Sequence, residues 1–195
     1  MDVWVNSLRF LHILTVVFMS APLYNLIIVR ERGLLGPSMT YPIDRYMENL
    51  IKKNSVRCFF YQLTALITGI ALVYLEGLGF SSIFTNWVLL LKTVLLLALM
   101  GLLSFVHLYI QPRIEGLLSP VKNDPIPEEI AGRIRPLRLS RTRLAGFCLF
   151  LVITSIILGV QTFDAYPPGL TITLVLLAAI FSWRVYKKPP RFGWI

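Results

Sequence analysis

The segment Asn86–Arg113, NWVLLLKTVLLLALMGLLSFVHLYIQPR, decides the class of this protein. As a helix rising about 1.5 Å per residue, its apolar run is long enough to cross the roughly 30 Å hydrocarbon core of a bilayer. It also carries Lys92 near one end and His107 near the other. An ionisable residue at membrane depth is energetically costly, so each of these two is treated as a functional-site hypothesis whose interaction partner must be found.

The composition of the whole chain fits the same class. Of 195 residues, 56% are hydrophobic and only 15% are charged, which is typical of a helical membrane protein and not of a soluble domain. The net charge is +9, but the basic residues flank apolar runs instead of forming one basic face. This distribution predicts a lipid bilayer as partner and argues against nucleic acid. Cys58 and Cys148 are expected to be buried, reduced and structural.

Hydropathy predicts an all-α protein with a single membrane domain over residues 1–195 and five transmembrane helices. These five spans are expected at residues 10–29, 58–74, 87–110, 144–161 and 170–185. Two amphipathic surface helices are expected in the connecting loops. In the first loop, Ile43, Met47 and Leu50 recur at helical spacing between charged residues. The second, Pro127–Arg138, begins with a proline and acidic residues.

The positions of the lysines and arginines predict the orientation. Seventeen of the nineteen lie in residues 30–57, 111–143 and 184–191, which five spans would place on one side of the membrane. The positive-inside rule makes that side cytoplasmic. We therefore expect a multi-pass protein of the cell (inner) membrane with its N-terminus outside and its C-terminus in the cytoplasm.

Depth in the membrane predicts which ionisable residues can meet. His12 lies 18 residues before Arg30, about 27 Å from that boundary, and Lys92 lies 21 residues before Arg113, about 31 Å from it. His107 is only six residues from Arg113, about 9 Å. His12 and Lys92 are therefore expected to share the outer part of the membrane, whereas a metal site using both histidines is geometrically poor.

The chemistry of these side chains suggests a haem. A neutral imidazole is a good iron ligand, and an uncharged lysine amine can also bind iron. We predict His12 and Lys92 as metal ligands of a haem packed between the helices. His107 lies roughly 60° around the helix from Lys92 and is a candidate for holding a second cofactor near the cytoplasmic side.

Structural explanations stay open for the same residues. Lys92 lies only about 8 Å below Trp87, so its alkyl stem could carry the amine to the outer headgroups. His12 could be an interfacial histidine that is hydrogen-bonded to a carbonyl. His107, near the inner interface, could have a purely structural role.

Two stretches resemble a known membrane family. Residues 8–30, LRFLHILTVVFMSAPLYNLIIVR, and residues 86–100, NWVLLLKTVLLLALM, are similar to the family of HemJ-type protoporphyrinogen oxidases and CopD-like copper-resistance domains. That family shares a histidine early in the first helix and a lysine shortly after a tryptophan, which correspond here to His12 and to Lys92 after Trp87. The resemblance covers about residues 8–115. In the HemJ-like branch this pair is associated with haem b binding and porphyrinogen oxidation, so the resemblance implies haem b at His12 and Lys92.

The chain also departs from the family pattern. A tryptophan-glycine stretch after the histidine is replaced here by Phe18–Pro22, and no Asn-Glu-x-Pro-like segment follows the third span. A long basic loop and a fifth span are additional. These differences favour a haem-binding role over the oxidase activity. Copper transport would call for methionine or histidine clusters, which Met19 and Met100 alone do not supply.

The sequence therefore predicts an integral membrane haem b protein that acts in electron transfer or as a membrane subunit of a redox complex. Other membrane or redox subunits are its expected partners. Two alternatives stay open. One is a non-catalytic structural subunit whose basic loops contact partners or anionic lipid headgroups. The other is a HemJ-like protoporphyrinogen oxidase.

Overall fold

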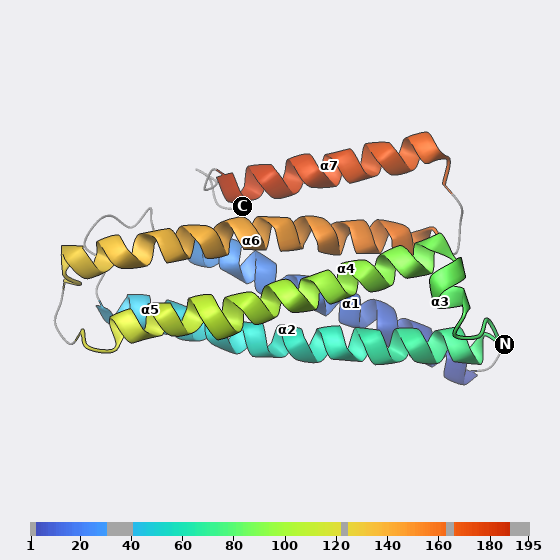
Figure 1. Ribbon diagram of the computed structural model, residues 1–195, viewed down its shortest axis with the longest axis horizontal. Coiled ribbons are helices and arrows are strands. Elements are labelled where there is room, and N and C mark those ends of the chain that lie inside the picture. Colours follow the sequence, from blue (N-terminus) through green and yellow to red (C-terminus); the bar gives the residue numbers. More distant parts are fainter. Residues whose placement is uncertain (1–2, 31–40, 122–124, 163–165, 188–195) are drawn as a thin grey trace.

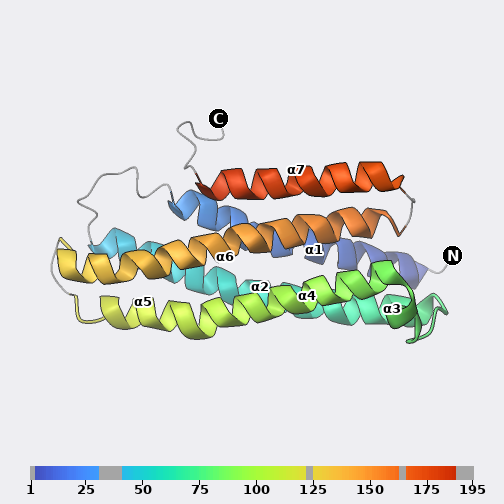
Figure 2. The ribbon, with the colours of Figure 1, turned by 45° about the horizontal axis from the view of Figure 1, so that its top comes forward.

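The protein is a bundle of long antiparallel helices (Figure 1). The computed structural model describes residues 3–30, 41–121, 125–162 and 166–187, and every element within these ranges is helical. In chain order the elements are α1 (Val3–Arg30), α2 (Tyr41–Leu75), α3 (Ser82–Thr85), α4 (Trp87–Phe105), the π-helical segment η2 (Val106–Ile110), α5 (Gln111–Leu118), α6 (Glu128–Val160) and α7 (Pro168–Lys187). Helix α7 lies along the edge of the bundle, next to α6 (Figure 2).

The prediction of an all-α protein is confirmed for the described residues, and so is the prediction of five helices that could span a membrane. Five helical stretches are long and apolar enough to cross a membrane, with α4, η2 and α5 counting as one stretch, Trp87–Leu118. They contain all the predicted spans except residue 161, the last of the fourth. Helices α2 and α6 are longer than the predicted spans because charged segments continue them at their N-terminal ends.

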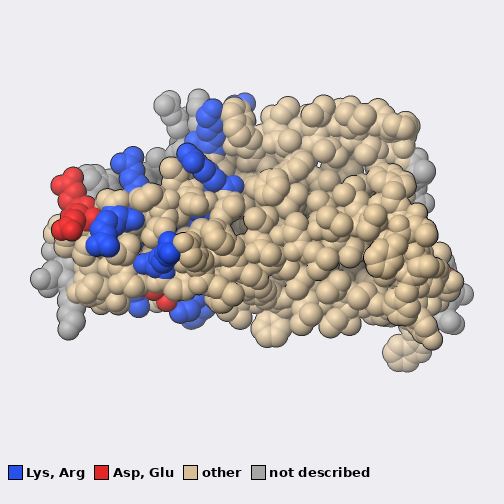
Figure 3. All heavy atoms as spheres, viewed as in Figure 1, with Lys and Arg blue, Asp and Glu red and all other residues tan. Residues whose placement is uncertain are grey.

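The two predicted surface helices are instead parts of longer helices. Helix α2 has 35 residues and α6 has 33, or about 52 and 50 Å of helix, which exceeds the hydrocarbon thickness of a bilayer. Residues 43–53 form the start of α2, and residues 128–138 form the start of α6. Both starts lie at one end of the bundle, where most of the visible lysines, arginines and acids gather (Figure 3). We call this the basic end, and the opposite end, which holds α3, the far end.

A buried stripe along α2 explains why the charged segment joins the bundle. The buried residues of this helix are mostly three or four positions apart and so share one face: Asp44, Glu48, Ile51, Asn54, Ser55, Cys58, Gln62, Ala65, Thr68 and Val73. The surface-helix prediction placed Asp44 and Glu48 on the solvated face, whereas the structure buries both to 1% exposure. Ile43 and Tyr46 are the exposed ones, at 46% and 69%.

The buried acids pair with arginines of α6. The Nη1 and Nη2 groups of Arg141 donate to the two carboxylate oxygens of Glu48 at 2.6 and 3.1 Å. Arg138 donates from Nε to Glu48 at 3.0 Å and forms an ion pair with Asp44. Gln111 at the start of α5 accepts from Arg141 Nη1 at 2.7 Å. We call these five residues the charged cluster; it joins α2, α5 and α6 at the basic end.

Apolar contacts hold the middle of the bundle. Met19, Cys58, Leu99, Leu151 and Val152 form a buried core cluster that joins α1, α2, α4 and α6. A second cluster attaches α7, where Tyr186 packs with Ile27, Ala145 and Leu149. The Tyr186 hydroxyl also donates to the backbone carbonyl of Leu23 at 2.9 Å.

The third span contains a π-helical turn for a local reason. Pro112 follows it, and in a regular α-helix the proline ring clashes with the carbonyl four residues back. The Gln111 N–H donates to the Val106 carbonyl, five residues back, which widens the turn over Val106–Ile110. His107 lies in this wide turn.

Removing the shared carboxylate of the charged cluster is expected to destabilise the bundle strongly. Glu48→Ala leaves Arg141 buried without its ion-pair partner, and such a loss costs about 3–5 kcal/mol. The measurement is the apparent free energy of unfolding in mixed micelles, followed by circular dichroism. Lys52→Ala is the control, because Lys52 pairs with Glu115 at 3.0 Å while half exposed, and its loss should cost less than about 1 kcal/mol. Equal effects of the two substitutions would contradict a structural role for the cluster.

Candidate functional site

The structure brings His12 and Lys92 together inside the bundle. His12 lies on α1 and Lys92 on α4, both half-buried, and the two side chains are close enough for their charges to interact. Both lie in the half of the bundle toward the far end, away from the charged cluster. That the imidazole and the amine share one depth in the membrane stays a prediction.

A hydrogen-bond chain fixes the imidazole of His12. Its Nδ1 lies 2.8 Å from the hydroxyl oxygen of Thr68 on α2. That hydroxyl can donate to the Thr64 carbonyl at 2.7 Å or to the Ala65 carbonyl at 3.2 Å, and we infer that its oxygen then accepts from Nδ1–H of the histidine. In this inferred tautomer Nε2 carries a lone pair. Histidines that bind metals commonly have this pattern, with one ring nitrogen donating to a neighbour and the other binding the metal.

Two glycines bring helix backbones close to this pair. A Cβ atom added to Gly69 would lie 3.3 Å from Cε1 of His12, so the glycine lets the imidazole approach α2 closely. A Cβ added to Gly159 would lie 3.9 Å from the Lys92 amine. The lysine amine therefore lies beside the last turn of α6, at the far end of the bundle.

The Lys92 amine has no direct hydrogen-bond or ion-pair partner among the described residues. It interacts at longer range with the charge of Glu76. Glu76 itself pairs with Arg9 at 2.8 Å, and both side chains are partly exposed. An intramembrane lysine without a direct partner is treated as a functional-site hypothesis.

His107 lies elsewhere. It is 15 residues after Lys92, about 22 Å along the helix, and lies in the π-helical segment. Its ring packs edge-on against Phe59 with centroids 5.8 Å apart. Its Nδ1 is buried without a hydrogen-bond partner among the described residues. The structure thus does not join His107 to the His12–Lys92 pair.

His12 and Lys92 alone are too few ligands for a metal ion held by protein side chains only. The described residues contain no group of three or more histidines, cysteines, aspartates or glutamates that could hold a metal ion. Metal ions bound by protein alone typically need three or four such ligands. An iron already held by a porphyrin needs only one or two axial ligands, and His12 with Lys92 could supply them.

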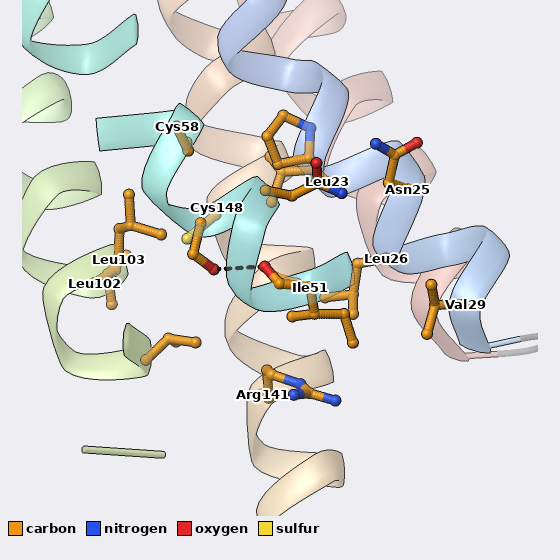
Figure 4. Close-up of a pocket in the computed structure, with 15 residues that line it drawn as sticks. Leu23, Asn25, Leu26, Val29, Ile51, Cys58, Leu102, Leu103, Arg141 and Cys148 are labelled. Carbon is orange, nitrogen blue, oxygen red and sulfur yellow. Dashed lines mark hydrogen bonds between the residues drawn. The ribbon is translucent and has the colours of Figure 1, made fainter. Parts of the chain in front are cut away.

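A second feature is a cavity of about 70 Å³ toward the basic end, between α1, α2, α4 and α6 (Figure 4). Its walls are mainly apolar, with Leu23, Leu26 and Leu103 among them. Asn54 and Arg141 also line it, and both are at most 5% exposed. The Asn54 Nδ2 and the Arg141 Nε are buried without a partner among the described residues. An unsatisfied buried donor costs roughly 1–3 kcal/mol, so these two groups need an explanation.

Several of these residues were not found from the sequence. Nothing in the sequence marks Thr68 as a partner of His12, and the acids of the charged cluster fall in a predicted surface helix. One signal was available: the stripe of Cys58, Gln62 and Ala65, extended backward in steps of three or four, leads through Ile51 to Glu48 and Asp44. Asn54 and the cavity have no comparable signal, because a cavity depends on how four helices pack.

Comparisons with protein-family models, with curated proteins and with solved structures found no match. The resemblance to the HemJ and CopD family therefore depends on the sequence stretches alone.

Replacing Thr68 by valine should release the imidazole while keeping the shape of the side chain. Wild-type His12 is expected to carry its proton on Nδ1, and Thr68→Val removes the acceptor that selects this tautomer. The measurement is the ¹⁵N spectrum of histidine-labelled, cofactor-free protein, which is simple because the chain has two histidines. Thr64→Val is the matched control, since the Thr64 hydroxyl donates to Phe60 in its own helix. A wild-type signal from Nε2–H would contradict the assignment.

Proposed function

We propose that this chain is an integral membrane protein that binds a b-type haem between His12 and Lys92. Its role would be electron transfer, alone or as the haem-bearing subunit of a redox complex. The observation that supports this most is the 2.8 Å contact between His12 Nδ1 and the Thr68 hydroxyl, which in the Nδ1–H tautomer leaves Nε2 free to bind iron. The lone amine of Lys92 on the facing helix is the second support, and the family resemblance is the third.

The residues would divide the binding as follows. His12 would bind the iron through Nε2, and Thr68 would hold the ring in position and increase its basicity through the Nδ1 hydrogen bond. Lys92 would be the second axial ligand when uncharged, or pair with a propionate when charged. The bound haem would supply a one-electron redox centre whose potential depends on its axial ligands and on burial.

We further propose that the basic end faces the cytoplasm, with the N-terminus outside. The described lysines and arginines that are visible in Figure 3 gather at or toward the basic end, as the positive-inside rule requires of a cytoplasmic side. Arg32, Lys122, Lys188 and Arg191, which also enter that argument, lie outside the described residues. In this orientation the His12–Lys92 site lies near the outer face of the cell membrane.

The orientation is testable by thiol labelling. Ser81→Cys at the far end and Ser119→Cys at the basic end are made in a background with Cys58→Ala and Cys148→Ala. Both serines are exposed. In intact cells a membrane-impermeant maleimide should label the variant at position 81, whereas position 119 should react only after permeabilisation. The reverse pattern would overturn the proposed orientation.

Haem binding is tested by the absorbance spectrum of the purified protein, oxidised and then reduced with dithionite. The wild type should show a Soret band that shifts on reduction. His12→Ala should lose most of the haem, and Thr68→Val should weaken haem binding about tenfold, as substitution of outer partners of metal-binding histidines does. Lys92→Ala should lower occupancy or change the spectrum, whereas Lys53→Ala should have no effect.

His107→Ala separates one haem from two. Full haem content in this variant would confine the cofactor to the His12–Lys92 site, and a fall to about one half would place a second haem near His107. The absence of any Soret band in the wild type would overturn the proposed function. A stable multi-subunit assembly without pigment would then favour a structural subunit, and rescue of a strain lacking protoporphyrinogen oxidase would favour the enzyme.

A further inference from the structure

Helix α5 lies beside the start of α6 at the basic end (Figure 1), and an open groove of about 580 Å³ lies between them. The residues that line it are Arg113, Gly116, Leu117, Arg133, Pro136 and Leu137. Leu117 and Leu137 also pack against a buried apolar cluster of Ile110, Ile114, Leu118 and Ile134. The packing of the two helices therefore sets the shape of the groove. A Cβ added to Gly116 would meet no atom within 4 Å, so space is open at this position.

The two arginines of the groove have no ion-pair partner in the described part of the chain. Arg113 and Arg133 are both exposed, and neither pairs with a described acid. Glu115, the acid of α5, already pairs with Lys52 at 3.0 Å. Glu129 lies one helical turn before Arg133 but forms no ion pair with it. Two cationic groups without partners favour an anionic ligand.

Arg113 continues a column of exposed aromatic rings. The rings of Phe105 and Tyr109 stack with centroids 5.1 Å apart, and Cζ of Arg113 lies 3.7 Å from the centroid of the Tyr109 ring. A guanidinium stacked on a ring is held in place, while the N–H groups along its edge can still donate. Phe105 and Tyr109 are exposed and belong to the apolar third span. A cationic group therefore adjoins apolar surface that continues into the membrane-spanning part of the helix.

The groove lies where the third span leaves the hydrocarbon. Arg113 is the first charged residue after Lys92. It is 26 residues after Trp87, about 39 Å along the helix. The hydrocarbon core of a bilayer is roughly 30 Å thick, and the bilayer with its headgroups is about 40–45 Å thick. With Trp87 at one interface, Arg113 therefore lies among the headgroups of the opposite leaflet, at the level of the phospholipid phosphates.

We propose that this groove binds an anionic phospholipid of the leaflet at the basic end. Arg113 and Arg133 donate to phosphate oxygens of the headgroup, and an acyl chain lies along Phe105 and Tyr109. The forked N–H groups of arginine match the oxygens of a phosphate, and basic pockets between membrane helices are typical sites for such headgroups. An acidic peptide would satisfy the arginines but leave the aromatic column unused, so a lipid fits better. The inference depends neither on the haem nor on the orientation of the protein.

The experiment is native mass spectrometry of the purified full chain in detergent micelles, titrated with phosphatidylglycerol or with phosphatidylcholine of the same acyl chains. The wild type should bind phosphatidylglycerol about tenfold more tightly, and Arg113→Gln and Arg133→Gln should each weaken that binding about fivefold. Gly116→Phe should fill the groove and abolish the preference. Arg135→Gln is the matched control, since Arg135 is exposed on the same helix but does not line the groove, and it should bind like the wild type.

Two further measurements make the outcome decisive. In phosphatidylcholine, Arg113→Gln and Arg133→Gln should keep nearly the wild-type unfolding temperature, because neither breaks an ion pair among the described residues; a clear loss would indicate a structural role and overturn the assignment. Inorganic phosphate, compared with chloride at equal ionic strength, should not displace phosphatidylglycerol, and neither should poly-glutamate. Displacement by phosphate would assign the groove to a free anion, and displacement by poly-glutamate would assign it to an acidic protein; either result would overturn the proposal. Equal affinity for the two lipids, full binding by Gly116→Phe, or equal effects of Arg135→Gln and Arg133→Gln would do the same.

Discussion

The contact between Glu48 and Arg141 constrains the rest of the bundle. Both side chains are almost fully buried, and removing two charges from water is costly unless their hydrogen-bonding capacity is met. Here both carboxylate oxygens accept from Arg141, one also accepts from Arg138, and the other lies 3.4 Å from the Gln111 amide. Sliding α2 against α6 by one turn would separate all of these groups. The contact therefore fixes the register of the two longest helices.

Because α2 is one continuous helix, the register that Glu48 fixes at one end also determines the packing of α2 at its other end. Glu48, Asn54 and Thr68 belong to one buried stripe, so the pairing of Glu48 with α6 also determines which groups Asn54 and Thr68 face. Inside an apolar bundle each polar group has to find a partner within the protein or in a ligand. Thr68 finds one in His12, whereas the Asn54 amide nitrogen finds none among the described residues. Thr68 therefore positions another side chain, whereas the Asn54 amide nitrogen is an unpaired donor among the described residues.

Features that depend on neighbouring residues could be predicted from the sequence, whereas features that depend on residues far along the chain could not. The five spans follow from local hydropathy, and the meeting of His12 with Lys92 follows from the fixed rise of a helix, which converts sequence distance into depth. The burial of Asp44 and Glu48 could not be derived in the same way, because it depends on Arg138 and Arg141, some 90 positions further along the chain. Local periodicity also misled, since the acids between Ile43 and its apolar neighbours suggested a solvated side, whereas Asp44 and Glu48 are buried.

The two candidate sites occupy different levels of the same helices. Pro22 at the cavity is ten residues from His12 on α1, and Cys58 at the cavity is ten residues from Thr68 on α2, about 15 Å in each case. The core cluster around Met19 and Leu99 begins in this interval and is closely packed. Groups more than about 7–10 Å apart without shared partners usually act additively. A substitution at one level should therefore leave the chemistry at the other unchanged, and any coupling between them would have to pass through α1, α2, α4 and α6, the helices they share.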